Sequence, residues 1–196
     1  MLVNYLKKNL NIIILNINFI SIWNYFIMTD NYLHVYLHNS KNISKLFLLC
    51  KYNSYLNLDS LMDIKCEDIC HFTNKYRFKV TYVFVSEYYN IRFFFTVFLK
   101  EYANLASISE YFNSAEYLER LVWDEFGVNF NLENKKINRR LLTDYGFKGH
   151  PLKKNFPLTG FYECVFFFEK LRIKNIPINL LQESRKFSFR NYVLSC

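Results

Sequence analysis

Hydrophobic and polar positions follow strand-like patterns most clearly over residues 78–99. Residues 78–86 are rich in Val, Phe and Tyr, residues 91–99 are rich in Phe with Ile, Val and Leu, and a short segment that contains Tyr-Tyr-Asn separates them. Such residues favour strands, and a short connection of this kind favours a hairpin. We therefore predict two adjacent antiparallel strands. Because both faces of the first run are largely apolar, we expect that strand to be covered on both sides.

Shorter patterns predict the rest of the sheet. Leu33, Val35 and Leu37 alternate with Tyr and His side chains, which indicates a strand over residues 32–38. We predict further strands over residues 56–64, 106–109 and 163–168, and a helix that Asn39 or Ser40 would cap and that runs to about residue 52. This mixture predicts an α+β fold, in which helices pack on a mixed sheet.

A second helix is predicted from about residue 114 to Gly127, which would serve as its C-terminal cap. Its apolar stripe consists of Ala115, Leu118, Val122 and Phe126, which should face the sheet. On another face, Glu116, Arg120 and Asp124 stand at successive i, i+4 positions and predict a charge ladder.

Two other features of this helix carry expectations. Glu119 and Asp124 are candidate paired carboxylates for acid–base chemistry, but they stand five residues apart with Arg120 close by. We therefore predict that they form ion pairs. Trp123 stands near Phe126 and is predicted to lie in the core.

Regular patterns end at residues 138–160, which hold three of the four glycines and two of the three prolines. We predict an irregular segment that runs over the surface, with an extended tail after the last strand. Gly146 and Gly149 permit turns with positive φ, and Pro151 and Pro157 stiffen the path. His150, between Gly and Pro, is predicted to be a hydrogen-bonded turn residue rather than a catalyst or ligand.

Composition changes this picture little. With 196 residues, 52% of them hydrophobic and 20% aromatic, the chain is unlike disordered sequences and long enough for a substantial core. We divide it into an apolar extension over residues 1–30, an α+β domain over residues 31–130 and an extended C-terminal segment over residues 131–196. The net charge of +8 is spread along the chain and suits nucleic acid, anionic lipid or an acidic partner.

The N-terminal extension contains an uncharged run over residues 10–28, which is as long as a membrane span. Asn11, Asn16, Asn18 and Asn24 interrupt it and would be costly in lipid. It lacks the pattern of a secretory signal or of a matrix-targeting peptide. We predict a buried or partner-packed helix here, with a membrane span as the alternative.

The five cysteines are Cys50, Cys66, Cys70, Cys164 and Cys196, an odd set without paired close spacing. A reducing compartment suits them better than a disulfide framework. Cys66, Cys70 and His71 form the only local cluster, and zinc or iron–sulfur sites normally require four ligands at recognisable spacings. We predict no metal there. No Walker A string, dinucleotide-binding glycine motif or nucleophile elbow occurs, which disfavours an independent enzyme.

Two long aperiodic strings point to a family. ERLVWDEFG at residues 119–127 and RRLLTDYGFKGHPLKKNFPL at residues 139–158 resemble the signature of the 30-kDa subunit family of respiratory complex I. That family carries E-R-E-x-W-D-M-F-G and then R-R-I-L-T-D-Y-G-F-x-G-H-P-L-R-K-D-F-P-L. The string QESRKFSF at residues 182–189 resembles its tail, and Leu61, Asp63 and Ile64 resemble its L-x-D-I strand. The resemblance covers residues 56–189.

The sequence departs from the family pattern at several positions. Leu121 stands where the family has Glu, Glu125 where it has Met, Asn155 and Ser188 each where it has Asp, and Val165 near an expected Arg. Each departure removes or moves a charge, so the partner contacts are in doubt but the family is not.

The resemblance implies a structural subunit of the peripheral, matrix-side arm of NADH:ubiquinone oxidoreductase at the mitochondrial inner membrane. It would lie beside the quinone-site subunits and the subunit with the terminal iron–sulfur cluster. FMN and the clusters would belong to these partners, and this chain would have no cofactor, no catalytic residue, no membrane span and no nucleic-acid partner.

Rigid aromatic and basic side chains are typical of protein interfaces, so we predict that the irregular segment docks on partners. The docking candidates are Arg139, Arg140, Asp144, Tyr145, Phe147, Lys148, His150, Lys153, Lys154, Phe156, Glu163 and Arg185. The residues of the structural motif are Glu119, Arg120, Trp123, Asp124, Gly127, Gly146, Gly149, Pro151 and Pro157.

Two other functions compete with this interpretation. A basic mitochondrial RNA-binding or ribosomal protein would use the positive charge for phosphates and exposed aromatics for base stacking. Here most aromatics stand in strand and helix patterns that indicate a core. The second alternative, a membrane-spanning assembly protein, is supported only by residues 10–28.

Overall fold

The computed structural model describes residues 26–29, 32–37, 43–54, 56–69, 75–131 and 138–182. The chain divides into two compact units, Met1–Phe156 and Pro157–Cys196, and each is described by itself.

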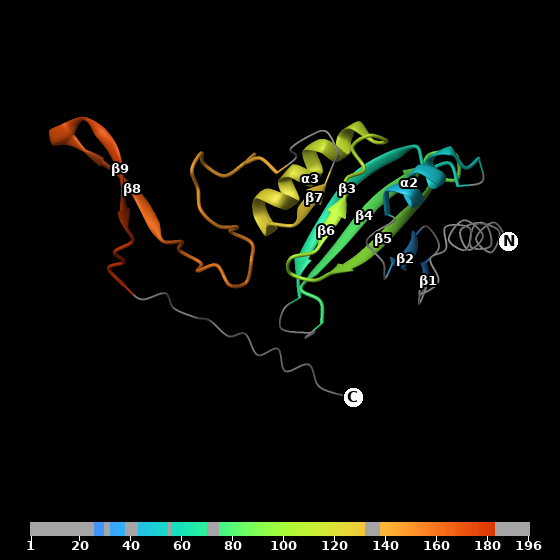
Figure 1. Cartoon of the computed structure of the whole chain (residues 1–196), viewed down its shortest axis with the longest axis horizontal. Coiled ribbons are helices and arrows are strands. Elements are labelled where there is room, and N and C mark those ends of the chain that lie inside the picture. The colour runs from blue at the N-terminus through green and yellow to red at the C-terminus, as the bar shows by residue number, and fades with distance from the viewer. Residues whose placement is uncertain are drawn as a thin grey trace. The chain divides into compact units, whose positions relative to one another are not determined.

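The first unit is built on a five-stranded mixed sheet with strand order β1-β2-β5-β4-β3 (Figure 1). The strands are β1 (Phe26–Thr29), β2 (Tyr32–Leu37), β3 (Ser60–Asp68), β4 (Phe78–Ser86) and β5 (Ile91–Leu99). β2 and β5 are parallel, and the other neighbours are antiparallel. The predicted hairpin over residues 78–99 is therefore confirmed, and so is the α+β class.

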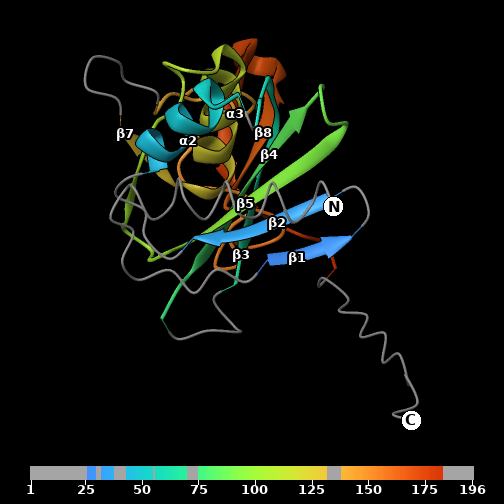
Figure 2. The ribbon, with the colours of Figure 1, turned by 90° about the vertical axis from the view of Figure 1, so that its right-hand side faces the viewer.

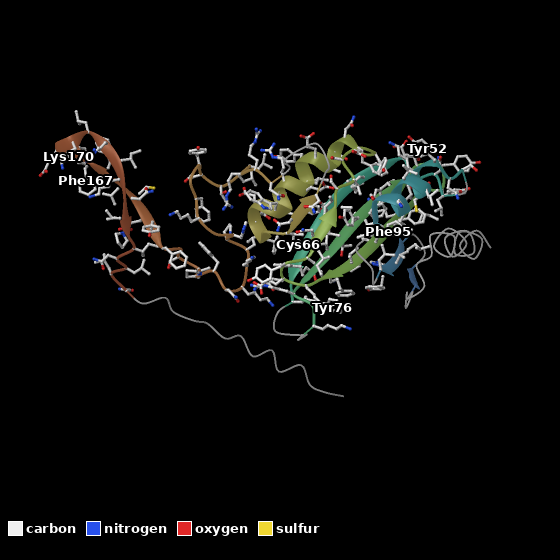
Figure 3. The ribbon with its side chains drawn as sticks, viewed as in Figure 1. Tyr52, Cys66, Tyr76, Phe95, Phe167 and Lys170 are labelled. Carbon is white, nitrogen blue, oxygen red and sulfur yellow. The ribbon has the colours of Figure 1, made fainter. Side chains whose placement is uncertain are left out.

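Two helices lie on one side of this sheet (Figure 2). They are α2 (Ile43–Tyr52) and α3 (Asn113–Phe126). From α2, the ring of Phe47 lies 5.0 Å from that of Tyr82 and 5.3 Å from that of Phe95, which Figure 3 marks within the sheet. The apolar stripe of α3 packs on the same core as predicted. Aromatic burial of this extent is the main stabilising contribution of the unit.

The other face of the sheet is covered less than the sequence predicted. On β4, Val83 is buried, but Lys79, Thr81 and Val85 are only half-buried. Cross-strand pairs stabilise this face: the Thr81 and Thr96 hydroxyls lie 3.2 Å apart, and polar and charged side chains take the positions near the strand ends. Among the described residues, full coverage is thus limited to the helix side.

Several predicted boundaries are wrong for local reasons. The strand expected over residues 56–64 begins at Ser60, because the chain turns at Asn53 and Asn57 takes a positive φ of 45°. The strand expected over residues 106–109 is β6 (Asn104–Ala106), which pairs in parallel with β7 (Asn129–Asn131). A helix was expected over residues 10–28, but the last three residues of that run belong to β1. The remainder of that run, and the predicted caps Asn39 and Ser40, lie outside the described residues.

The second unit is a β-hairpin of β8 (Tyr162–Phe167) and β9 (Arg172–Pro177), joined by the short 3-10 helix η1 (Phe168–Lys170). Figure 3 marks Phe167 and Lys170 at the closed end of this hairpin. The predicted strand is confirmed, but the extended tail is wrong over residues 172–177, because Leu171 takes a positive φ of 45° and reverses the chain. None of residues 157–182 is buried.

Candidate functional site

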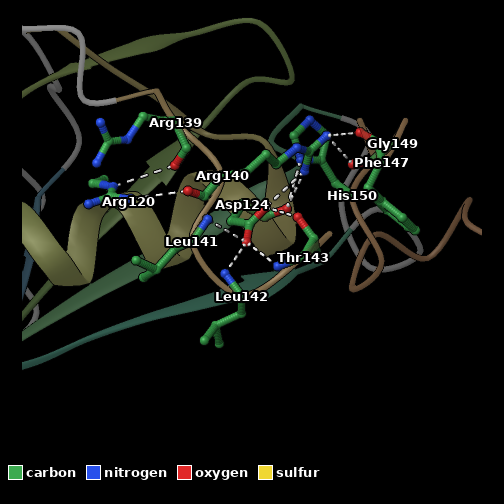
Figure 4. Close-up of polar contacts among 10 residues, drawn as sticks. All are labelled: Arg120, Asp124, Arg139, Arg140, Leu141, Leu142, Thr143, Phe147, Gly149 and His150. Atoms are coloured by element: carbon green, nitrogen blue, oxygen red, sulfur yellow. Dashed lines mark hydrogen bonds and ion pairs between the residues drawn. The ribbon is translucent and has the colours of Figure 1, made fainter. Parts of the chain in front are cut away.

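The carboxylate of Asp124, in the last turn of α3, gathers the start of the irregular segment around itself (Figure 4). Its Oδ2 accepts hydrogen bonds from the backbone N–H groups of Leu141, Leu142 and Thr143, at 3.2, 2.9 and 3.0 Å. Its Oδ1 accepts from the Thr143 hydroxyl at 2.5 Å and from Arg140 Nη1 at 2.9 Å. The side chain is 0% exposed. Five donors thus converge on one buried carboxylate.

These contacts determine the ionisation of Asp124. Burial by itself raises the pKa of this carboxyl, but the hydrogen bonds from Thr143, Arg140 and Leu142 outweigh burial and hold the pKa well below its usual range. The group is therefore an ionised anchor for the segment at neutral pH.

Arg140 connects the helix to more distant parts of the segment. Its Nη2 donates to the carbonyl oxygens of Phe147 at 3.0 Å and Gly149 at 2.8 Å, while its Nη1 donates to Asp124. The guanidinium lies over the rings of Trp123 and Phe147, at 5.1 and 5.7 Å. A planar group with five N–H donors suits such a junction, which a lysine would not replace.

The segment also completes the C-terminus of α3. Gly127 closes the helix with a φ of 74° and donates to the Trp123 carbonyl at 2.8 Å, as predicted for a cap. The carbonyl of Asp124 accepts from Arg140 and from His150 Nδ1, at 3.1 and 3.0 Å. The carbonyl of Glu125 accepts from the Leu152 N–H at 3.1 Å. The last turn has no basic residue of its own, so Arg140 supplies the cation that a helix C-terminus favours.

His150 is a structural member of this cluster. Since a carbonyl only accepts, its Nδ1 carries the proton in the bond to Asp124. Burial, aided by Lys153 and Arg140, lowers the pKa of His150, so the ring is neutral at pH 7. Its ring packs edge-on against Trp123 at 5.7 Å, and a Cβ at Gly127 would lie 2.6 Å from it. The expectation of a hydrogen-bonded turn residue is confirmed.

The far end of the segment is held by a second carboxylate. Asp68, at the end of β3, has a side chain only 1% exposed, and its Oδ2 accepts from the Lys154 N–H at 3.1 Å and from Arg77 Nη2 at 3.4 Å. Arg77 also pairs with Glu101. Residues 140–154 are therefore clamped at both ends to the sheet-and-helix body.

Between these clamps, some side chains point away from the body. Leu142, Asp144, Tyr145, Lys148 and Leu152 are exposed, as is Arg139 just before the first clamp. Phe147 and Phe156 instead pack on each other at 5.8 Å beneath Gly149. The predicted docking candidates therefore separate into inward-facing residues that shape the segment and outward-facing residues that are available to a partner.

The charge ladder expected on α3 does not continue from Arg120 to Asp124. Asp124 turns to the segment, and the Arg120 guanidinium donates to the carbonyl oxygens of Arg139 and Arg140, at 3.5 and 3.1 Å. Helical spacing alone could not reveal these partners, because they lie about twenty residues further along the chain. Trp123 is likewise half-buried under the segment and is absent from the sheet core among the described residues.

Glu119 has no ion-pair partner among the described residues, contrary to the prediction. Its carboxyl is fully buried between α3 and the chain after β6, and it accepts from Ser107 Oγ at 2.5 Å and from the Ile108 N–H at 2.8 Å. Burial raises the pKa of Glu119 to about 7, although both hydrogen bonds oppose this rise. The ion pair predicted for Asp124 is confirmed, with Arg140 as the partner.

Sequence reasoning missed Thr143, Asp68 and Arg77. Thr143 stands inside the aperiodic string, three residues after Arg140. This position within the motif could have marked it as a residue of the site. Asp68 and Arg77 carried none, because Asp68 meets a residue 86 positions further along the chain.

The cysteines with described surroundings do not gather. Cys50 is buried in α2, Cys66 lies on β3 and Cys164 is exposed on β8, while Cys70 and His71 lie outside the described residues. Burial raises the pKa of the Cys50 thiol to about 12. Across the described part of the chain, no group of three or more His, Cys, Asp or Glu residues is placed to hold a metal ion. No described helix is long and apolar enough to cross a membrane.

Comparison with known proteins agrees with the motif strings. Residues 36–162 match the family model described as "Respiratory-chain NADH dehydrogenase, 30 Kd subunit". The chain belongs to this 30 kDa subunit family. The match includes the Asp124 cluster and both clamps, so the resemblance predicted from the motifs is confirmed.

Similar proteins within the 30 kDa subunit family have related names. "NADH dehydrogenase (ubiquinone) iron-sulfur protein 3" of Oryza sativa subsp. japonica is 41% identical over 144 residues, 72% of this chain and 74% of that protein. "NADH-ubiquinone oxidoreductase subunit 9" of Dictyostelium discoideum is 36% identical over 161 residues, 81% of this chain and 76% of that protein.

One solved structure shares the fold of this chain. A chain of the membrane-bound sulfane sulfur reductase, an archaeal respiratory membrane complex, is similar with a TM-score of 0.61 and 16% identity. The similarity covers 78% of this chain and 85% of that one.

Four of the departures from the family motifs stand among the described residues. Leu121 and Glu125 are half-buried on α3, Asn155 is exposed and Val165 is half-buried on β8. Neither Leu121 nor Asn155 takes a described role in the two clamps. Ser188 and the docking candidate Arg185 lie outside the described residues.

Proposed function

We propose that this chain is a structural subunit of the peripheral, matrix-side arm of mitochondrial NADH:ubiquinone oxidoreductase, where it holds neighbouring subunits in place. Membership of the 30 kDa subunit family supports the assignment of this chain to that enzyme complex. The partners proposed from the family resemblance are the quinone-site subunits and the subunit with the terminal iron–sulfur cluster.

The observation that carries the structural role is the hairpin of the second unit. The hairpin and the residues that flank it expose large apolar side chains: Leu158, Phe161, Tyr162, Phe166, Phe167, Phe168, Leu171, Ile173, Leu180 and Leu181. An isolated two-stranded hairpin is marginally stable in water, and exposed apolar patches of this kind mark interaction sites. A partner protein would supply the core that residues 157–182 lack.

The two faces of the hairpin differ in charge. Strand register places Tyr162 opposite Pro177 and Phe166 opposite Ile173 on one face, with the uncharged Cys164 and Asn175 between them. The other face carries Glu163, Lys174 and Arg172. We expect the uncharged face to lie against the apolar part of a partner and the charged face to lie nearer solvent.

We also propose that this chain carries no redox centre, so that FMN and the iron–sulfur clusters belong to partner subunits. Thiolates are the usual ligands of such clusters, and the buried Cys50 thiol, whose pKa is raised to about 12, is poorly suited to that role. The name of the Oryza relative includes "iron-sulfur protein", so the point needs a direct test. Iron and acid-labile sulfide at stoichiometric levels in the purified chain would disprove it.

The main test is native-gel profiling of mitochondrial membranes solubilised in mild detergent, with this chain followed by mass spectrometry. We expect the chain to migrate with NADH-oxidising activity and to resist extraction from that band by salt. Migration with ribosomal particles would contradict the proposal and favour the RNA-binding alternative, in which binding depends strongly on salt.

A further inference from the structure

We propose that Tyr145 is the anchor by which residues 139–148, the docking tip, enter an apolar socket on a neighbouring protein subunit whose rim carries carboxylates. This inference rests on the proposed function and names one contact residue and the chemistry of its partner.

The first observation is the exposure of Tyr145. Its exposed fraction is 104% of the fully exposed reference, so the ring contacts little of its own chain. Leu142, three residues earlier, is 64% exposed, and Figure 4 shows its side chain pointing away from the Asp124 cluster. Removing these two side chains would therefore cost the fold little packing.

The second observation is the rigidity of the backbone that carries this ring. Asp144 to Phe147 form a turn in which the Phe147 N–H donates to the Asp144 carbonyl at 3.0 Å, with Gly146 at a φ of 84°. The residues before the turn are clamped by Asp124, and Arg140 holds the carbonyl of Phe147 after it. Because this backbone is already ordered, docking would lose little conformational entropy.

Tyrosine on such a support is well suited to binding. It presents a large apolar ring with few rotatable bonds, and it is enriched among residues that dominate interface affinity. The hydroxyl would remain hydrogen-bonded at the edge or the base of the socket.

The charges of the docking tip indicate the rim of that socket. Arg139 and Lys148 are exposed on either side of Tyr145, and Asp144 is the only acidic residue of residues 139–148. This positive surround favours carboxylates on the partner and disfavours a basic or lipid-tail surface. The charge would mainly speed association, whereas the ring would determine how long the contact lasts.

Competitive incorporation tests this contact in the assembled complex. Wild-type chain and Tyr145→Ala chain are expressed together in a host that depends on this subunit, and the NADH-oxidising band is isolated from a native gel. Trypsin would release residues 141–148 as one peptide, which differs between the two chains and reports their ratio. Tyr102→Ala is the matched control, because Tyr102 is 86% exposed in another turn.

We expect Tyr145→Ala to be depleted from the band by about tenfold relative to its share of the total chain, which is a typical loss for an interface anchor. Tyr102→Ala should be incorporated in proportion to its abundance, and Tyr145→Phe should come close to wild type. Lys148→Glu should also be depleted from the band, but less than Tyr145→Ala.

Two results would overturn the inference. Proportional incorporation of Tyr145→Ala, while wild type migrates with NADH-oxidising activity, would reject Tyr145 as the anchor and leave the proposed function intact. A wild-type chain found only with RNA-containing particles would reject both. Equal melting temperatures of the purified wild-type and Tyr145→Ala chains would show that depletion reflects docking and not folding.

Discussion

Asp124 and Glu119 stand five residues apart on α3, yet their surroundings move their pKa values in opposite directions. Asp124 is surrounded by five donors that include a guanidinium, which lowers its pKa. Glu119 has two neutral donors and deep burial, which raises its pKa to about 7. The number and charge of the donors decide which effect prevails.

Removing the Asp124 carboxylate should release the irregular segment. We expect Asp124→Ala to lower the free energy of unfolding by about 3–5 kcal/mol, because Arg140 and three backbone N–H groups lose a buried partner. Urea denaturation measures this loss, and faster tryptic cleavage after Arg140 reports the release. Asp144→Ala is the control: its side chain is exposed, so we expect a change within about 0.5 kcal/mol. Equal losses in both variants would contradict the anchor role.

Glu119 should make stability depend on pH near neutrality. Its pKa is raised from 4.5 to about 7, so the folded chain binds this proton more tightly than the unfolded chain. The resulting stabilisation is complete below pH 4.5 and is lost as the pH rises through about 7. At about 1.4 kcal/mol per pKa unit, the loss is on the order of 3 kcal/mol.

The comparison that isolates this effect is wild type against Glu119→Gln in urea titrations from pH 4.5 to 8.5. As the pH rises, we expect the unfolding free energy of wild type to fall relative to that of Glu119→Gln. A difference that stays constant over this range would show that Glu119 has an ordinary pKa.

At the scale of elements, the last carbonyl groups of α3 accept hydrogen bonds from a segment that follows the helix in the chain. Helices usually satisfy their last carbonyl groups with local caps or water. Here Gly127, His150, Arg140 and Leu152 all contribute. The helix end and the segment should therefore lose structure together.

Gly127 and Gly146 provide a matched pair to test this coupling. Both have positive φ, 74° and 84°, but only at Gly127 would a Cβ meet the His150 ring, at 2.6 Å. We expect Gly127→Ala to cost about 3 kcal/mol, from backbone strain and displacement of His150, and Gly146→Ala to cost about 1 kcal/mol from strain alone. Urea midpoints of the two variants measure this. Equal midpoints would mean that His150 moves aside without cost.

Elements with a clear residue pattern were predicted well from the sequence. β4 and β5 were predicted with their observed bounds, because each is an unbroken run of nine residues rich in strand-forming side chains, and a short turn joins the two runs. The bounds of β3 and β6 were missed because backbone turns at Asn57 and after Ala106 interrupt patterns that still look apolar. Leu56 and Leu58 are buried without belonging to a strand.

At the scale of the whole molecule, the two units differ in what stabilises them. All buried residues of the described chain lie in the first unit, whereas the hairpin has none. Folding of the first unit is driven by its own core, and the hairpin depends on what covers it.

Deletion of residues 157–196 should therefore separate stability from assembly. We expect the shortened chain to melt within about 2 °C of the full chain, since residues 157–182 contribute no buried side chain. It should nevertheless be absent from the NADH-oxidising band on native gels, because the hairpin would be missing. Incorporation at the wild-type level would show that the hairpin is dispensable, and a large fall in melting temperature would show that it stabilises the first unit.

The sequence by itself determined the family, the α+β class, the central hairpin, the Gly127 cap and the region of the site. These follow from local patterns and from a long aperiodic string. Only the tertiary structure decided that Asp124 and Arg140 face inward, that Glu119 is buried with Ser107 and Ile108 as donors, and that Tyr145 faces solvent. The physical reason is that a side chain's role depends on which distant donors and apolar groups surround it. Asp68 meets residue 154, and Asp124 meets residues 140–143. No local pattern encodes these distances.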